Sequence, residues 1–163
     1  MIKNPLLTIC LLSHNGEKFL EKSLKNILCQ NYSNFEILVS DNQSVDKTEE
    51  IIKSFQGQNS TITFRKNALD KKPGKFYDGC YSNCNGCINS GLVNGEFVSF
   101  WHQDDIYEKN IAKREAEFLI NNPNVGAVFT LGNIIDENNK IIGKYKLPKE
   151  LKGKNIYNFA DIF

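Results

Sequence analysis

Four short apolar runs lie along the first two thirds of the chain, separated by longer polar segments. The runs cover residues 6–12, 35–39, 61–64 and 97–101. Mostly apolar stretches of this length are strand-sized, and the first has the pattern of a strand that is covered on both faces of a sheet. We therefore expect four strands, the first of which ends at the turn formers His14, Asn15 and Gly16.

Helical periodicity fills the gaps between these runs. In residues 17–29 the apolar side chains recur every three or four positions and form one stripe opposite lysines and glutamates. A second helix is predicted up to Gly57, with Ser44 or Asp46 as its cap, and a third over residues 106–120, closed before Pro123. Residues 80–93 predict a weaker helix because they are rich in Asn and Gly.

The alternation of strands and helices predicts the fold class. Strand, helix, strand at short spacing is the order of parallel βαβ units, so we expect an open, mainly parallel α/β sheet with helices on both faces. Further apolar pieces at 125–130, 134–135 and 141–142, with a turn at 136–139, predict a hairpin packed beside the main sheet. Residues 67–78 predict a polar loop, with a basic flap near phosphates as the alternative, and residues 156–163 begin another element.

Length and charge narrow the possible partners. The 163 residues suit one domain, and we predict a single domain over 1–163. With 20 basic and 19 acidic residues the net charge is +1, which gives no long-range attraction to nucleic acid or to an anionic membrane. No stretch approaches the ~20 apolar residues that cross a bilayer, and the N-terminus lacks a secretory signal. We therefore expect a cytoplasmic protein with no transmembrane segment.

The five cysteines, an odd number, suggest reduced thiols rather than a disulfide framework. Cys80, Cys84 and Cys87 have the C-x₃-C-x₂-C spacing by which radical SAM enzymes hold a [4Fe–4S] cluster. The short chain, which cannot form a full barrel, argues against that hypothesis. The alternative is that these cysteines face the core from a helix, and Cys10 and Cys29 are interpreted as buried apolar residues.

Two adjacent carboxylates, Asp104 and Asp105, follow the fourth predicted strand. Like charges this close raise each other's pKa unless a cation compensates them, and hard carboxylate oxygens suit Mg²⁺ or Mn²⁺. His102 points to the same side as Asp104 if the strand continues, so it is a third candidate ligand. The alternative is that the two aspartates cap a helix that starts near Ile106.

Polar residues also follow the first two strands. In open α/β sheets, ligands bind beyond the carboxyl ends of the strands, where His14, Asn15 and Asp41 should meet the aspartate pair. A carboxylate at position 41 can accept a hydrogen bond from a nucleobase N–H or a ribose hydroxyl. Its alternative role is that of a turn or cap residue.

Three segments together resemble family 2 glycosyltransferases. They are Leu7-Thr-Ile-Cys-Leu-Leu-Ser-His-Asn-Gly16, Gln30-Asn-Tyr-Ser-Asn-Phe-Glu-Ile-Leu-Val-Ser-Asp-Asn-Gln-Ser-Val-Asp46 and Asn94-Gly-Glu-Phe-Val-Ser-Phe-Trp-His-Gln-Asp-Asp-Ile-Tyr107. In that family the first strand commonly ends in a Pro-Thr-Tyr-Asn-like turn, the second in Asp-Asp-Gly-Ser-x-Asp, and the fourth in a D-x-D-type cluster. The resemblance covers about residues 5 to 145 in matching order.

The resemblance implies a GT-A fold and a metal-assisted, inverting transfer of a sugar from a nucleotide diphosphate, a UDP-sugar above all, to a saccharide or glycolipid acceptor. It implies that Ser13, His14, Asn15, Asp41 and Asp104 contact the nucleotide sugar, and that Mg²⁺ or Mn²⁺ is held by Asp104, with Asp105 and His102 as further candidates. The resemblance also implies peripheral association with the inner face of a membrane.

The sequence departs from the family in ways that keep alternatives open. Asn42 and Gln43 replace Asp-Gly, and His102 replaces the first aspartate of the D-x-D cluster. No general base is identifiable before Phe163, so we predict a domain truncated at its acceptor-binding side. The first alternative is a nucleotide-sugar-binding module without catalysis. A sugar nucleotidyltransferase is the second, although the Gly-rich phosphate loop of those enzymes is missing near the first strand.

Overall fold

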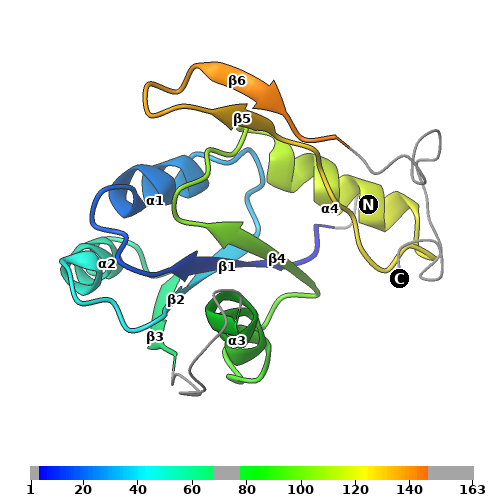
Figure 1. Cartoon of the computed structure of the whole chain (residues 1–163). Coiled ribbons are helices and arrows are strands. Elements are labelled where there is room, and N and C mark those ends of the chain that lie inside the picture. The colour runs from blue at the N-terminus through cyan, green and yellow to red at the C-terminus, as the bar shows by residue number, and fades with distance from the viewer. Residues whose placement is uncertain (1–3, 68–77, 147–163) are drawn as a thin grey trace. The chain divides into compact units, whose positions relative to one another are not determined.

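The computed structural model describes residues 4–67 and 78–146, and its main feature is a four-stranded parallel sheet (Figure 1). The strands are β1 (Leu7–Ser13), β2 (Phe35–Asp41), β3 (Ile62–Lys66) and β4 (Phe97–His102), in the order β3-β2-β1-β4. The helices are α1 (Leu20–Leu28), α2 (Thr48–Gln56), α3 (Asp78–Ile88) and α4 (Ile111–Asn121). The predicted open parallel sheet is confirmed.

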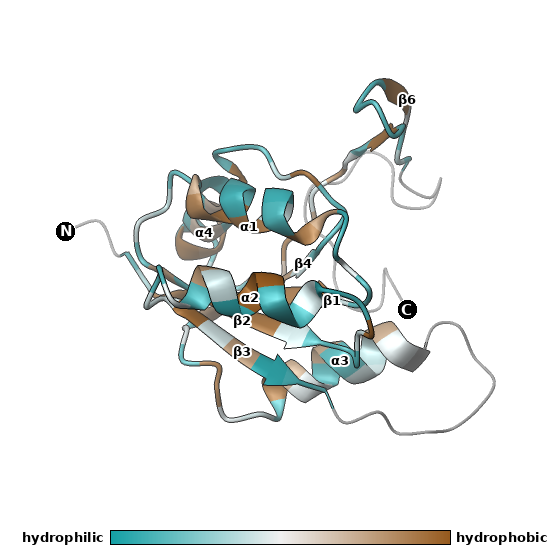
Figure 2. Ribbon diagram, turned by 90° about the vertical axis from the view of Figure 1, so that its left-hand side faces the viewer, coloured by the Kyte–Doolittle hydropathy of each residue, from teal (hydrophilic) through white to brown (hydrophobic). Residues whose placement is uncertain are grey.

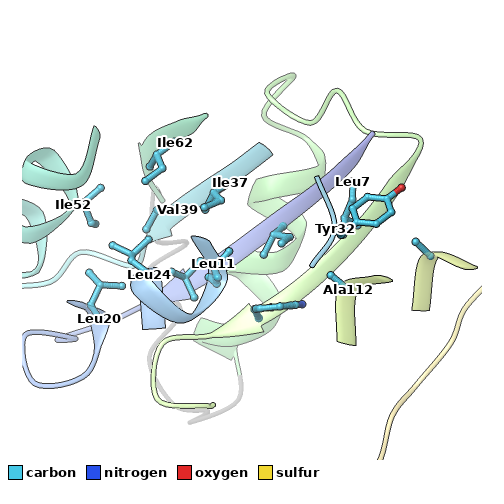
Figure 3. Packing of buried hydrophobic residues seen from close by; sticks show 14 residues of the cluster. Leu7, Leu11, Leu20, Leu24, Tyr32, Ile37, Val39, Ile52, Ile62 and Ala112 are labelled. Carbon is cyan, nitrogen blue, oxygen red and sulfur yellow. The ribbon is translucent and has the colours of Figure 1, made fainter. Parts of the chain in front are cut away.

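Helices cover both faces of the sheet because β1 is apolar on both sides, and every residue of this strand is buried. Leu7, Ile9 and Leu11 pack with side chains of α1, α2 and α4 in one core, part of which Figure 3 shows. Cys10 and Leu12 point to the other face, where α3 lies. The prediction of a strand covered on both faces is therefore confirmed for β1.

The helices on the first face are amphipathic, as the periodicity predicted. In α1 the buried residues are Leu20, Ser23, Leu24 and Ile27, while charged residues occupy its outer side. Figure 2 shows hydrophobic and hydrophilic stretches alternating around α1 and α2. At the start of α2, Asp46 accepts hydrogen bonds from the backbone N–H of Thr48 at 3.0 Å and from its hydroxyl at 2.5 Å. The N-cap of α2 is Lys47, which makes no side-chain cap bond, so the prediction of Ser44 or Asp46 as the cap is wrong.

The helix predicted at residue 106 begins instead at Ile111. The backbone between residues 106 and 110 forms hydrogen bonds with side chains at and just after the end of α1. The N–H and C=O of Tyr107 each bond the Asn26 side chain at 2.9 Å, and the C=O of Glu108 accepts from Gln30 Nε2 at 3.0 Å. Because these long-range bonds replace helical ones, residues 106–110 form a loop and the aspartates at 104 and 105 do not cap α4.

The start of the sheet is fixed by a carboxylate network. Glu36 Oε1 accepts hydrogen bonds from the Thr8 hydroxyl at 2.6 Å and from the Asn94 N–H at 2.9 Å, and Oε2 accepts from Asn94 Nδ2 at 3.0 Å. Burial raises the pKa of Glu36, but the hydrogen bonds lower it more, so its net pKa lies below the ordinary value. The network joins β1, β2 and the segment that leads into β4.

We expect this network to stabilise the fold only when Glu36 is ionised. Its stabilising effect is complete above the unfolded-state pKa, about 4.3, and is lost as the pH falls through the lowered folded-state pKa. Urea unfolding of the wild type and of Glu36→Gln should differ by about 1 kcal/mol at pH 7, from the charge-assisted hydrogen bonds, and by less at pH 3. A gap that stays constant between the two pH values would contradict this account.

The chain separates into two compact units, Met1–Glu117 and Phe118–Phe163. In the second unit, β5 (Asn133–Ile135) and β6 (Ile141–Lys144) pair antiparallel, which confirms a hairpin, while residues 125–130 form no strand. The packing of the hairpin beside the main sheet stays a prediction. Most of the 67–78 loop and the element at 156–163 lie outside the described residues. Within residues 4–67 and 78–146, no helix is both long and apolar enough to span a bilayer.

Candidate functional site

The strand register brings the carboxyl ends of β1, β2 and β4 to one line. Ser13 is aligned with Asp41 on β2, and Leu12 with His102 on β4. The polar segments that follow these strands therefore start side by side, as the sheet topology predicted. Ser13 is 3% exposed and Asp41 is fully buried, whereas His14, Asn15, His102, Asp104 and Asp105 are exposed.

Gln103 joins the segment after β4 to the segment after β1. Its Oε1 accepts from the Ser13 hydroxyl at 2.6 Å and from the His14 N–H at 3.1 Å, and its Nε2 donates to the His14 carbonyl at 2.8 Å. A Cβ atom at Gly16 would lie 2.0 Å from Gln103 Oε1. The absence of a side chain at position 16 therefore makes room for this amide.

The segments after β1 and β2 are also joined. His14 Nδ1 donates to the Asn42 carbonyl at 2.9 Å, and Asn15 Nδ2 donates to His14 Nε2 at 3.2 Å. Because a carbonyl only accepts, these bonds fit a neutral imidazole with its proton on Nδ1. The Asn15 N–H donates to the Ser44 hydroxyl at 2.8 Å, so the two loops form one surface.

Asp41 closes a turn in this structure. One of its oxygens accepts from the Ser44 N–H at 3.0 Å, and the other accepts from the Ser44 hydroxyl. Gln43, between them, has a φ of 58°, a left-handed conformation in which glycine is more comfortable. This arrangement corresponds to the turn role considered above, and the predicted contact of Asp41 with a nucleobase stays a prediction.

Tyr107 shapes the loop that carries the aspartate pair. Its ring stacks on buried Trp101 with centroids 3.8 Å apart, and its hydroxyl accepts from the His102 N–H at 2.9 Å. Burial raises the pKa of Tyr107, as does the Asp105 carboxylate. The phenol therefore keeps its proton, which it donates to Asp105 Oδ2 at 3.3 Å.

The three predicted metal ligands do not form a ready site. Among the described residues, no three His, Cys, Asp or Glu side chains are placed to hold a metal ion, so the predicted trio of His102, Asp104 and Asp105 is not assembled. One local reason is that the Asp105 carboxylate already accepts a hydrogen bond from the Tyr107 hydroxyl. Asp104 is exposed, and no hydrogen bond to its carboxylate is found in the described part of the chain. A single free carboxylate fits Mg²⁺ or Mn²⁺, which commonly take one or two protein carboxylates and complete their shell with water and phosphate.

The iron–sulfur hypothesis is not supported by the arrangement of the cysteines. Cys80, Cys84 and Cys87 all lie on α3, and Cys87 is buried against Cys10. No metal-holding trio includes them in the residues that are described. The alternative, cysteines that face the core from a helix, is correct for Cys87, while Cys84 is half-buried and Cys80 is exposed. Cys10 is buried as expected, but Cys29 is exposed.

Sequence reasoning missed Gln103 and Tyr107. Both lie inside the quoted fourth-strand motif, but the argument from charge selected only the carboxylates and the histidine beside them. The signal for Gln103 was a polar side chain directly after an apolar strand, at the predicted ligand edge. The partners of Gln103 are about 90 residues away in sequence, so spacing alone does not reveal them.

We expect Gln103→Ala to lower the free energy of unfolding by about 2 kcal/mol, because it leaves the buried Ser13 hydroxyl without its acceptor and removes two further bonds. Urea unfolding followed by circular dichroism measures the change. Gln58→Ala is the matched control, since that exposed side chain makes one bond within its own helix end, and it should change stability by less than about 0.5 kcal/mol. Equal effects in the two variants would contradict the role given to Gln103.

Comparison with known protein families gives one match to nearly the whole chain. The model described as "Glycosyl transferase family 2" matches residues 8–161. An uncharacterized glycosyltransferase of Methanocaldococcus jannaschii is 29% identical over 95% of this chain and 51% of its own length. The GalNAc(5)-diNAcBac-PP-undecaprenol beta-1,3-glucosyltransferase of Campylobacter jejuni is 29% identical over 97% of this chain and 46% of its own length.

A third relative is the UDP-Glc:alpha-D-GlcNAc-diphosphoundecaprenol beta-1,3-glucosyltransferase of Escherichia coli, 28% identical over 90% of this chain and 53% of its own length. The chain thus spans about half the length of the curated relatives it matches.

Solved structures share the fold. A mannosyltransferase from Pyrobaculum calidifontis, in complex with GDP-Man and Mn²⁺, superposes with a TM-score of 0.61 at 21% identity, over 77% of this chain and 35% of that one. Residues 1–349 of TarS from S. aureus, in complex with UDP, superpose with a TM-score of 0.56 at 19% identity, over 82% of this chain and 43% of that one. These likenesses confirm the predicted GT-A fold.

Proposed function

The chain belongs to glycosyl transferase family 2, and from this premise we propose that it carries the donor site of an enzyme that moves a sugar from a nucleotide diphosphate to an acceptor. The observation that carries the proposal is the free, exposed carboxylate of Asp104 beside the joined loops after β1 and β2. Ligands of open α/β sheets bind at this edge.

The loops offer suitable groups for a nucleotide sugar. We propose that Ser13, His14 and Asn15 line the donor pocket and that Asp41, with Ser44, borders the base. Gln103 holds the backbone of His14, and Tyr107 holds Asp105. The site is thus positioned before a ligand arrives, which reduces the ordering cost of binding. We propose UDP as the nucleotide, since a relative is named for UDP-Glc and a structural neighbour binds UDP.

Asp104 is the residue we propose as the protein ligand of Mg²⁺ or Mn²⁺, with Asp105 and His102 beside it. A bound divalent cation would supply positive charge next to the donor diphosphate. A structural neighbour contains Mn²⁺ with its nucleotide sugar, which supports a divalent metal. In this chain, Tyr107 fixes the aspartate loop and Gln103 fixes the opposite loop, so the diphosphate would be held between two preformed segments.

We propose a lipid-linked saccharide as the acceptor, because two relatives are named for undecaprenol diphosphate acceptors. Inversion at the anomeric carbon, cytoplasmic location and peripheral contact with a membrane are part of the same proposal. Catalysis also needs a general base, and the described residues contain no carboxylate that is placed for this role by a specific observation. A nucleotide-sugar-binding module is therefore the second candidate.

Calorimetric titration of UDP into the folded chain, with Mn²⁺ and then with EDTA, tests the donor site. We expect binding with Mn²⁺ and a large loss of affinity with EDTA. Incubation with UDP-sugars and a lipid-linked saccharide then separates the two candidates. A glycosyltransferase would transfer the sugar and form free UDP, whereas a binding module would bind the UDP-sugar and form none. Absence of binding under both conditions would contradict the proposed donor site.

A further inference from the structure

Helix α3 covers one face of the sheet (Figure 1), and four of the five cysteines lie on this helix and on β1. Cys80, Cys84 and Cys87 lie along α3, and Cys10 lies on β1. Their exposure falls in steps, from exposed Cys80 through half-buried Cys84 to fully buried Cys87 and Cys10. Leu12, Leu38 and Val93 pack around the buried pair.

Cys10 on β1 and Cys87 on α3 are both fully buried in one cluster of side chains where this helix packs on the sheet. Two thiols that are buried in one cluster on two different elements are candidates for a disulfide, which needs close Cα atoms. The interaction between the two thiols raises the pKa of Cys10 and lowers that of Cys87. Of the two thiols, Cys87 is therefore the one that loses its proton more easily.

The guanidinium of Arg65 lies close to α3. Arg65 donates to the Ser40 hydroxyl at 2.5 Å, and a Cβ atom at Gly86 would lie 2.8 Å from Arg65 Nη1, so the guanidinium packs against the turn that carries Cys87. The neighbouring Cys10 thiol, Ser40 hydroxyl and Arg65 guanidinium outweigh the effect of burial and lower the pKa of Cys87 to about 7. Thiolates, rather than thiols, are the nucleophiles in sulfur chemistry.

The helix that hides Cys87 is weakly built. Its sequence, DGCYSNCNGCI, contains two glycines, two asparagines and a serine, all of which are poor helix formers. Among its residues, Cys87 and Asn83 are the ones that are buried. An element with few buried apolar contacts opens locally at low free-energy cost, and opening exposes Cys87 to small solutes.

We propose that Cys87 is an oxidation site for small hydroperoxides and that Cys10 is the thiol that resolves it. In the first step the Cys87 thiolate attacks one peroxide oxygen, the O–O bond breaks, and the product is a Cys87 sulfenic acid with hydroxide as leaving group. In the second step the Cys10 sulfur attacks the Cys87 sulfur, the S–O bond breaks, and water leaves. Two thiols and one hydrogen peroxide thus give one disulfide and two waters, and the bond links β1 to α3.

The test uses the full chain, reduced and then treated with hydrogen peroxide. Remaining thiols are alkylated in denaturant, the protein is digested without reductant, and the peptides are identified by mass spectrometry. We expect a linked peptide pair that contains Cys10 and Cys87, with Cys29, Cys80 and Cys84 alkylated. Cys29→Ser is the matched control, because it removes an exposed thiol away from α3 and should leave the linked pair unchanged.

Cys10→Ser removes the resolving thiol, so the linked pair should disappear and Cys87 should be recovered as a higher oxide. The map of the wild type decides the proposal even if this variant does not fold. A disulfide within α3, between Cys84 and either of its cysteine neighbours, would overturn it. So would oxidation confined to the exposed thiols while Cys10 and Cys87 are both recovered alkylated.

Discussion

Asp104→Ala should lose metal-dependent binding of UDP while the protein stays folded. Asp104 is exposed, and no protein group in the described residues bonds its carboxylate, so its removal costs little in stability. If that carboxylate is the main protein ligand of the cation, the dissociation constant of UDP in Mn²⁺ should rise by about 100-fold or more, which corresponds to about 2.7 kcal/mol. Calorimetry in Mn²⁺ and in EDTA measures the effect.

Glu137→Ala serves as the control for Asp104→Ala. Glu137 is an exposed carboxylate in the turn between β5 and β6, so its removal changes the net charge equally without touching the strand ends. Its affinity for UDP should equal that of the wild type. An unchanged affinity in Asp104→Ala itself, with normal circular dichroism, would remove the assignment of Asp104 as a metal ligand.

Gly95→Ala should destabilise the fold by about 3 kcal/mol or prevent folding. A Cβ atom at this position would lie 2.5 Å from the Thr8 nitrogen, 2.6 Å from the Phe97 oxygen and 2.8 Å from the Leu6 oxygen, all of them backbone atoms. Backbone atoms of paired strands cannot move aside as a flexible side chain can, so overpacking strains β1 and β4 together. The free energy of unfolding in urea gives the magnitude.

Gly57→Ala is the control for this substitution. Gly57 ends α2 with a φ of −61°, and the nearest atoms to an added Cβ lie at 3.7 Å, an ordinary contact. We expect a change of less than about 0.5 kcal/mol, or a small gain from the reduced entropy of the unfolded chain. A similar loss in both variants would indicate a general effect of replacing glycine rather than the close approach at Gly95.

The strands of the sheet could be predicted because each one is marked by the residues of its own segment. Each strand contains a mostly apolar run, and β1, β2 and β4 end at polar residues that the structure places at one edge. The start of α4 could not be predicted in this way. Ile106 and Tyr107 continue the apolar period of that helix, and only the bonds of Tyr107 to Asn26, 81 residues earlier, show why the helix begins later.

The candidate site was predicted in part for the same reason. Position after a predicted strand identified His14, Asn15, Asp41 and the aspartate pair, and the family resemblance added Ser13. Position did not show that Asp41 is fully buried against Ser44, nor that Gln103 links two loops. These properties depend on side chains that meet across the sheet, and no pattern in one segment encodes the identity of its distant partner.

The close fit of Gln103 over Gly16 has a consequence for how this site varies in evolution. Any side chain at position 16 occupies the space of the Gln103 amide, so the two positions are not free to change one at a time. Homologues with alanine or serine at position 16 should carry a shorter residue at position 103, and ancestral intermediates should have passed through changes at position 103 first. Laboratory evolution of donor specificity would then succeed sooner from libraries that vary the two positions together.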